Sequence, residues 1–320
     1  GGSLNGFGTG LSEKQMASYM ARINYGYKEK YLLTASARLD GSSVLADGHK
    51  WAPFYSAALG WRIDQEKFMK NVTFIDALKL RLGAGVTGNA AIGAYGTKGG
   101  ITQMYYNWGA TASTAGYIFS DLSASSPVLL ANSNLGWEKT TQYNLGLDYT
   151  LLKSRISGSM DIYKTQTKDL LMRMSIPSAT GYVQTWSNVG ETKGWGIDFQ
   201  VNSLNIKTKD FAWSTTLTWS LDRCKVEKLS NGRTQDIGSS LFVGKELGVY
   251  YDFVYDGIWK TSEATEAAKY GRKPGQIRVK DLNIDNVISS NDDRQIVGKT
   301  RPDWSAARRS CHRRPPGPRC

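Results

Sequence analysis

The stretch Leu78-Lys-Leu-Arg-Leu-Gly-Ala-Gly-Val-Thr87 alternates apolar side chains with polar or small ones. Leu78 and Leu80 point to one side of an extended chain, whereas Lys79 and Arg81 point to the other, because successive side chains of a β-strand face opposite sides. A period of two predicts a strand rather than a helix. The stretch therefore predicts a sheet with one apolar face and one polar face.

The same alternation recurs on both sides of this stretch. Each alternating segment is about 9–11 residues long, which is enough to cross a bilayer at the tilt of a barrel strand. We expect the other strands within residues 19–27, 33–40, 55–63, 143–149, 156–162, 195–201 and 213–221.

The connections between these segments alternate in length. Lys28–Lys30 and Leu152–Ser154 are tight turns, whereas Gly41–Pro53, Asn89–Trp137 and Lys168–Lys193 are long polar loops. Short turns on one side and long loops on the other are typical of outer-membrane barrels. A large soluble β-sandwich explains the alternation but not this asymmetry. The predicted fold is all-β, an antiparallel transmembrane β-barrel with long extracellular loops.

A further long segment, 223–303, follows the last predicted strand. It is rich in aromatic residues, and we expect it to be a long extracellular loop region. Within it, residues 262–270 have a helical pattern that Gly271 and Pro274 end.

The composition is compatible with a barrel. The 320 residues have a mean hydropathy of −0.40. No apolar run of about 18 residues occurs, which excludes a helical membrane span. A barrel strand is apolar only on its lipid-facing side, so its average stays polar. The 17 tyrosines and 10 tryptophans can form the aromatic girdles at the two membrane surfaces.

The scarcity of basic clusters, cysteines and histidines argues against several classes of function. The net charge is +12, but five arginines lie in the last 13 residues and no basic cluster alternates with aromatics, which argues against nucleic-acid binding. Three cysteines and two histidines form no disulfide framework or zinc pattern. There is no G-x-S-x-G motif and no plausible histidine-based triad, so we do not expect an enzyme.

Two other features have structural explanations. Gly83–Gly88 fits G-x-G-x-x-G, but no helix start and no acidic residue at the required spacing follow, so we attribute the glycines to crowding in a strand. Asp148, Asp161 and Asp198 alternate with the apolar positions and should face a polar lumen, where charge affects permeation.

A set of ordered motifs runs from about residue 17 to residue 304. One of them reads Asn134-Leu-Gly-Trp-Glu-Lys-Thr140. The full set comprises Tyr31–Ser43, Ser56–Ile63, Leu78–Asn89, Asn134–Asp148, Ser187–Gly190, Lys193–Trp195, Tyr255–Trp259, Lys269–Gly275 and Gly298–Trp304. In this order the motifs resemble the SusC/RagA family of TonB-dependent outer-membrane transporters.

The resemblance implies a barrel of about 22 strands with an N-terminal plug, located in the cell outer membrane. It implies a SusD-like surface lipoprotein as a lid, the TonB complex as energy source, and oligosaccharides or peptides as substrates. About eight strands occur here, and the signal peptide, plug and TonB-contacting segment are missing, so we expect a barrel fragment surrounded by outer-membrane lipid. Two alternatives are a barrel enzyme or adhesin without energy coupling, and a nonfunctional gene fragment.

The end of the chain has a different character. Residues 1–304 fit a partial barrel, whereas 305–320 are rich in Arg, Pro, Ala and Cys and lack an apolar alternation. An out-of-frame translation of GC-rich DNA has this composition. We therefore interpret 305–320 as a frameshifted tail, with a natural disordered basic tail as the alternative.

Aromatic residues in the predicted outer loops are the candidate substrate contacts. Flat rings stack on sugar faces and cover their C–H surface. The same residues can instead form girdles or pack loops together. The candidates are Trp51, Tyr105, Tyr106, Trp108, Tyr182 and Trp186, with Phe54 beside them.

One loop resembles a calcium site. Asp281, Asn283, Asp285 and Asp292 take positions one, three, five and twelve of a loop whose oxygen ligands alternate. Position six is Asn286 rather than Gly, and no helices flank the loop. A plain turn rich in Asp and Asn is the alternative. No other cofactor is expected.

Overall fold

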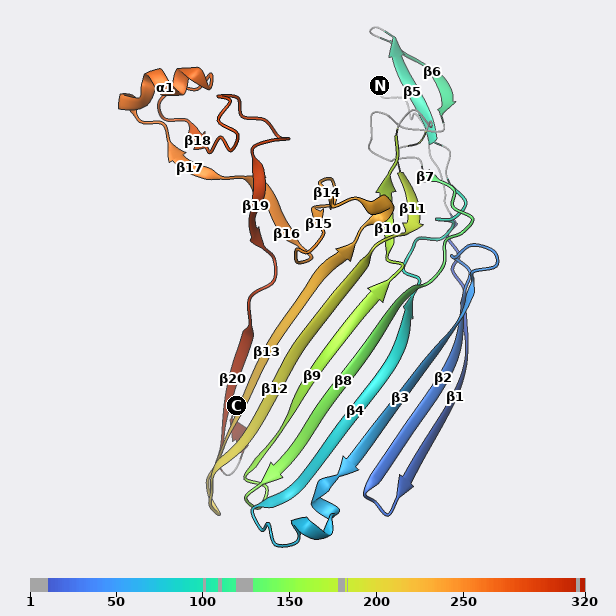
Figure 1. The fold of residues 1–320 in the computed structure, drawn as a ribbon, viewed down its shortest axis with the longest axis vertical. Helices are drawn as coiled ribbons and strands as arrows, with labels where there is room; N and C mark the ends of the chain where they lie inside the picture. Colours follow the sequence, from blue (N-terminus) through green and yellow to red (C-terminus); the bar gives the residue numbers. More distant parts are fainter. Residues whose placement is uncertain are drawn as a thin grey trace.

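The computed structural model describes residues 11–99, 102–108, 111–118, 129–177, 182, 184–314 and 317–319. Its main element is a ten-stranded sheet with the order β1-β2-β3-β4-β8-β9-β12-β13-β20-β21, in which every pair is antiparallel (Figure 1). The strands are β1 (Met16–Tyr27), β2 (Tyr31–Ser42), β3 (Trp51–Arg62), β4 (Ile75–Asn89), β8 (Glu138–Leu151), β9 (Ile156–Lys168), β12 (Glu191–Lys207), β13 (Ala212–Lys228), β20 (Ser305–Arg314) and β21 (Gly317–Arg319).

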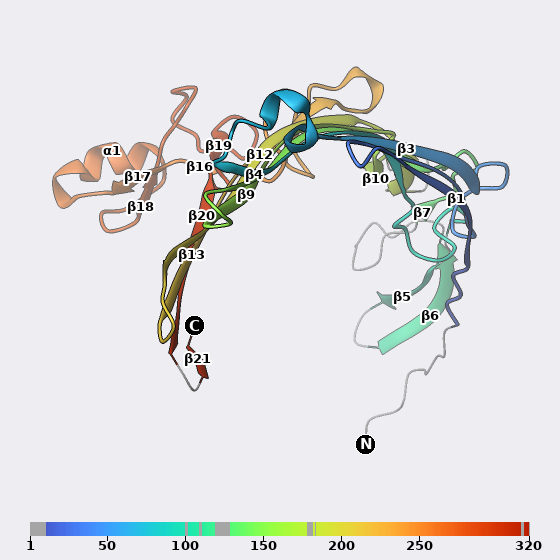
Figure 2. The same cartoon turned by 90° about the horizontal axis from the view of Figure 1, so that it is seen from below.

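The sheet is a curved wall rather than a closed barrel. Figure 2 shows it as an arc with β1 on one side and β20 and β21 on the other. Within the described residues the two edge strands do not pair, so the arc stays open. The antiparallel barrel wall predicted from the sequence is confirmed as part of a barrel.

All eight predicted strands are confirmed, but their predicted length of 9–11 residues is wrong. The first eight strands of the sheet have 12 to 17 residues. The extra residues lie at both ends of the strands. Many are polar, such as Thr165–Lys168 in β9, whereas β3 gains the apolar stretch Trp51–Phe54 at its long-loop end. Backbone pairing continues there although the apolar alternation has ended, because a ladder needs no hydrocarbon around it.

The short turns have conformations that their positions require. Lys28 and Glu29 both have positive φ, 51° and 54°, and are the central residues of a tight turn closed by the hydrogen bond from Lys30 N–H to the carbonyl of Tyr27 at 3.0 Å. After β3, the chain forms two short 3-10 segments, η1 (Ile63–Gln65) and η2 (Lys67–Met69). These turns lie together at one end of the wall in Figure 1.

The pairing register places apolar side chains on one face. Leu82 pairs with Leu59 on one side and Leu145 on the other, and Leu145 pairs with Ile162. These four side chains are 40–54% exposed. A contiguous apolar face of this kind is unfavourable in water and fits hydrocarbon instead.

No helix in the described part of the chain is long and apolar enough to span a membrane.

The other elements gather at the long-loop end (Figure 1). The expected helix at 262–270 is confirmed as η5 (Thr261–Glu263) followed by α1 (Ala264–Lys269), and Gly271 after it has a φ of 63°. The short strands are β5 (Thr102–Trp108), β6 (Thr111–Ile118), β7 (Leu129–Leu130), β10 (Leu171–Ser175), β11 (Gln184–Asn188), β14 (Gln235–Asp236), β15 (Leu241–Phe242), β16 (Val249–Phe253), β17 (Tyr255–Ile258), β18 (Ile277–Val279) and β19 (Arg294–Lys299), with η4 at Ser230–Gly232.

Strand β20 carries the sequence that we interpret as frameshifted. It pairs with β13 from Ser305 onward, and Arg308 lies opposite Leu217. Leu217 belongs to the apolar face, so the register places a guanidinium there. This position is compatible with the frameshift hypothesis, which stays a prediction.

Candidate transport surface

The polar face of the wall carries an ion-pair network. Arg81 on β4 donates from Nε and Nη2 to the carboxylate of Asp148 at 2.9 Å each, and from Nη2 to Asp161 at 3.0 Å. Gly146 lies between these residues in the register, and a Cβ there would lie 2.6 Å from the guanidinium carbon. The absent side chain lets Arg81 lie flat across the wall and hold three strands together electrostatically.

Carboxylates continue at the same level onto the next strands. Asp161 pairs in register with Asp198 on β12. Ser220 on β13 donates a hydrogen bond to Asp198 at 2.5 Å, and Arg301 forms an ion pair with Asp222. The prediction that the strand aspartates share the polar face is confirmed. The result is a band in which acidic groups are partly neutralised by two arginines.

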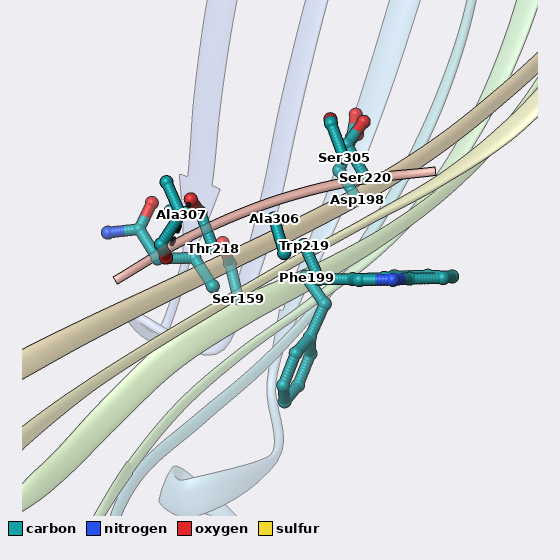
Figure 3. Close-up of a pocket in the computed structure, with 10 residues that line it drawn as sticks. Ser159, Asp198, Phe199, Thr218, Trp219, Ser220, Ser305, Ala306 and Ala307 are labelled. Atoms are coloured by element: carbon teal, nitrogen blue, oxygen red, sulfur yellow. Dashed lines mark hydrogen bonds between the residues drawn. The ribbon is translucent and has the colours of Figure 1, made fainter. Parts of the chain in front are cut away.

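A shallow hollow of about 280 Å³ lies beside this band, between β9, β12, β13 and β20. Figure 3 shows the side chains of Asp198, Ser220 and Ser305 on one side of the strands and that of Phe199 on the other. Hydroxyl and carboxylate groups line the polar side. Such a wall offers hydrogen bonds to a polar solute beside exposed apolar surface.

A hydrophobic cluster supports the loops at the long-loop end. The pairing of β3 with β4 stops at Ser56 and Gly85, although both strands continue. Phe54 lies against Gly88, where a Cβ would be 2.1 Å from the ring. We call this group the rim cluster; it comprises Val44, Leu45, Ala46, Ala52, Phe54, Ile92, Leu135 and Trp137.

The motif at residues 134–138 anchors the loops to the rim cluster. Leu135 is 0% exposed, and the Trp137 ring meets Phe54 edge-on at 5.4 Å between centroids. Trp137 Nε1 donates to the carbonyl of Lys50 at 2.8 Å. Glu138 accepts a hydrogen bond from the N–H of Leu171 at 3.0 Å. One short motif therefore fixes three loop segments.

Asn188 forms hydrogen bonds with two loop segments beside the rim cluster, at Gly136 and at Asp169. Its Oδ1 accepts from the N–H of Gly136 at 2.6 Å, and its Nδ2 donates to the carbonyls of Gly136 and Asp169 at 3.0 Å each. A polar hollow of about 320 Å³ next to it includes His49 and Lys139.

Two carboxylates of the loops are paired with lysines. Asp47 forms ion pairs with Lys50 at 2.7 Å and Lys98 at 3.6 Å, and the hydrogen bond from Lys50 holds the pKa of Asp47 below its usual value. Lys299 likewise lowers the pKa of Asp303. These lysines therefore favour the ionised form of Asp47 and Asp303.

Trp51 lies on the apolar side of the wall. Its ring covers Gly41, where a Cβ would be 2.7 Å away, and stacks on Tyr19 at 5.9 Å between centroids. This is the arrangement of a girdle residue. The predicted substrate contact at Trp51 stays a prediction, and the other candidates lie elsewhere.

Trp186 lies against the rim cluster, where Arg173 stacks over its ring at 5.2 Å. Tyr182 precedes it and is half-buried. Tyr105, Tyr106 and Trp108 lie on β5 in a hairpin that extends beyond the wall (Figure 1). The structure thus separates the candidates into Trp51, the pair Tyr182 and Trp186, and the hairpin.

The calcium-like loop forms a network of its own. Asp281 accepts backbone hydrogen bonds from Ile284 at 2.6 Å and Asn286 at 2.9 Å, and Asp285 accepts one from Val287 at 2.7 Å. Desolvation opposes ionisation of Asp281, but these N–H donors outweigh it and lower its pKa. Asn283 donates to Asp285 at 3.0 Å, and Asp292 accepts from Ser289 at 2.9 Å.

In the described residues no group of three or more His, Cys, Asp or Glu side chains could hold a metal ion. Calcium binding at this loop stays a prediction.

Two features of the site were not predicted. Arg81 was assigned to the polar face, but its two carboxylate partners are distant in sequence. Asn188 was part of a quoted motif without a role. The network of Arg81 could have been suspected from a charged residue in the middle of an alternating strand. No local feature of the sequence indicates the hydrogen bonds of Asn188.

Comparison with known proteins identifies the family of this wall. The family described as TonB dependent receptor-like, beta-barrel matches residues 3–295. The chain therefore belongs to the TonB-dependent receptor β-barrel family, whose members are outer-membrane proteins. Its relatives are receptors and transporters rather than enzymes.

Two relatives are informative. TonB-dependent receptor P3 of Formosa agariphila is 33% identical over 309 residues, which are 92% of this chain and 30% of that protein. TonB-dependent receptor SusC of Bacteroides thetaiotaomicron is 39% identical over 229 residues, which are 69% of this chain and 22% of that protein. The chain is of SusC/RagA type, and it spans less than a third of the length of these relatives.

The fold is also that of a solved structure. The structure of the RagAB peptide transporter superposes with a TM-score of 0.73 at 22% identity, covering 95% of this chain and 32% of that one. The structure of the RagAB peptide importer in its open-open state superposes with a TM-score of 0.74 at 23% identity. The described wall is therefore a part of a TonB-dependent receptor barrel.

Proposed function

We propose that this chain forms part of the wall and outer rim of a TonB-dependent importer of oligosaccharides or peptides. The observation that carries the proposal is the division of the sheet into two faces, below a layer of loops held by the rim cluster. The polar face has the acid and arginine band, which suits a path for polar solutes. The apolar face suits the membrane.

A SusD-like surface lipoprotein is the proposed partner at the rim. The identity with SusC and the fold shared with RagAB support this proposal. A loop layer fixed by Leu135, Trp137 and Asn188 offers a stable platform for such a lid. The TonB complex is the proposed energy source.

The substrate contacts that we propose are Trp186 and Tyr182 at the rim, together with the hairpin residues Tyr105, Tyr106 and Trp108. We choose Trp186 for the test of substrate contact because its ring lies next to polar groups of the loops, which could bind a polar substrate together with it. Removing one stacking ring should lower uptake by about 2- to 10-fold. Trp195, a tryptophan on the apolar face, is the matched control.

The experiment measures accumulation of labelled oligosaccharide and peptide pools by cells that carry the full-length protein. We expect cells to accumulate one of the two pools, and this accumulation should require the TonB complex. Accumulation should be lower in Trp186→Ala than in the unmodified protein and unchanged in Trp195→Ala. A lipoprotein of SusD type should co-purify from the outer membrane.

An outer-membrane adhesin or enzyme without energy coupling is the alternative. Accumulation that continues without the TonB complex would reject the importer proposal and favour this alternative. Equal effects of the two tryptophan variants would reject the substrate role of Trp186 alone.

A further inference from the structure

The apolar face has a groove at about mid-height of the wall. Its volume is about 570 Å³. Ala57 and Ala84, which are register partners on β3 and β4, form its floor. Leu59, Leu82 and Leu145 line it and are 54%, 47% and 43% exposed. Small side chains between large apolar ones leave an apolar furrow on this face, which suits hydrocarbon better than water.

Cationic side chains border the groove on the side of the long loops. Lys164 lines the groove, in register between Tyr143 and Trp195. Lys139 and Lys168 are register partners and lie four residues nearer the long loops than Tyr143 and Lys164. We call Lys139, Lys164, Lys168 and Lys225 the lysine belt; all four are exposed and alternate in phase with the apolar positions.

The acids near the belt form their ion pairs with other cations, although Glu191 is the register partner of Lys168. Glu227 pairs with Lys193 at 2.5 Å, and Glu191 pairs with Lys228 at 3.3 Å and accepts from Gln166. Among the ion pairs of the described residues, none includes a belt lysine. A lysine next to hydrocarbon extends its ammonium to the membrane surface, where lipid phosphates lie.

We propose that this face binds a phosphorylated lipid of the outer leaflet. One acyl chain lies in the groove over Ala57 and Ala84, and the phosphate is held by Lys164 and Lys168. The long-loop end of such a barrel faces outward, so the belt lies at the level of outer-leaflet headgroups. A soluble anion would leave the groove empty, and a zwitterionic lipid would bring a cation to the belt.

The test is native mass spectrometry of the full-length protein extracted in mild detergent. Added dioleoyl phosphatidic acid is the probe, dioleoyl phosphatidylcholine is the zwitterionic comparison, and inorganic phosphate is the competitor without acyl chains. We expect phosphatidic acid to be retained preferentially and inorganic phosphate not to displace it at equal concentration. One lysine near an anionic membrane surface accounts for about a fivefold change in binding.

Two variants separate the two parts of the site. K164Q/K168Q should lower phosphatidic acid retention at least about tenfold. Ala84→Leu fills the groove without changing charge and should lower retention although both lysines remain. K70Q/K209Q, at exposed lysines of the short-turn end, is the matched control and should retain the lipid as the unmodified protein does.

Equal retention of the two lipids, or equal losses in the belt and control variants, would overturn the proposal. Displacement by inorganic phosphate, or unchanged retention in Ala84→Leu, would overturn the role of the groove.

Discussion

At the residue scale, the polar face is organised by a few long side chains that lie over small ones. Arg81 covers Gly146, and the ring of Tyr163 covers Gly196, where a Cβ would be 2.3 Å from its hydroxyl. Each missing side chain allows a polar group to reach a partner on the next strand. Substituting these glycines would displace the partners rather than disturb the strand itself.

The Arg81 and Asp148 pair should show a measurable but modest coupling. Their side chains are 34% and 40% exposed, so solvent screens the attraction. A double-mutant cycle with Arg81→Met and Asp148→Asn should give about 0.5–1 kcal/mol of coupling in urea unfolding. A cycle between Arg81 and Asp236, which lies in the short strand β14 outside the wall, is the control. Zero coupling in the first cycle would contradict the bidentate contact.

Glu66 should make one turn sensitive to acid. It accepts hydrogen bonds from Lys30, Tyr31 and Trp61 at 3.1, 2.9 and 3.2 Å, and the contact with Lys30 is the main cause of its lowered pKa. The folded pKa lies below the unfolded value of about 4.3. The stabilisation is therefore complete above that value and is lost as the pH falls through the folded pKa.

Hydrogen exchange of residues 62–70, corrected for intrinsic rates, checks this prediction between pH 6 and pH 3. Protection should fall with pH in the unmodified protein and should be low throughout in Glu66→Gln. The same pH profile in both proteins would mean that Glu66 does not stabilise the turn.

At the element scale, the sequence predicted the strands well and the loops poorly. Alternation is a local property, so Leu78–Thr87 identified its own strand and its own apolar face. The rim cluster joins Val44, Ile92 and Leu135, which are far apart in sequence, and no local period reveals such contacts. The predicted strand lengths were wrong for a related reason, since pairing extends beyond the apolar alternation used to define them.

Leu135→Ala should loosen the loop layer without unfolding the wall. Truncating a fully buried leucine costs about 2–5 kcal/mol. Because the rim cluster lies in the loops, faster hydrogen exchange is expected at residues 43–50 and 132–137, with β8 and β9 unchanged. Leu145→Ala, at a 43% exposed position on the apolar face, is the control. Uniformly faster exchange in the strands would show that the rim and the wall unfold together.

Calcium binding at residues 281–292 requires the Asx hydrogen bonds to rearrange, because Asp281 and Asp285 already accept backbone N–H groups. If the loop binds calcium, calorimetric titration with millimolar calcium should give heat that D281N/D285N lacks. The absence of heat would leave the loop as a turn stabilised by its own side chains.

At the scale of the whole molecule, the sequence predicted the class of fold, the family and a partial barrel, but not the positions of the candidate ligand aromatics. The motif at 134–138 identified the family although its structural role was unknown. Trp51 and Trp186 look alike in sequence, yet the structure places one on the apolar face and the other beside the rim cluster. Only the three-dimensional register separates them.

The frameshift hypothesis predicts that β20 is a poor membrane strand. A charge on the lipid face costs up to about 4 kcal/mol at the bilayer midplane. Arg308→Leu should therefore raise stability in urea unfolding of the membrane-inserted protein, whereas Arg309→Leu on the polar face should not. Another reading frame of the DNA after codon 305 should continue the apolar alternation. If neither other frame does so, the hypothesis is wrong.

The strict alternation of the two faces also limits how this protein can evolve. Inserting one residue within β4 or β9 would exchange the membrane side and the lumen side for the rest of that strand. Insertions in the loops leave the phase of every strand intact. Length variation between species should therefore be concentrated above the rim cluster, and new substrate preferences should arise there through gained and lost segments while the wall changes only by substitution.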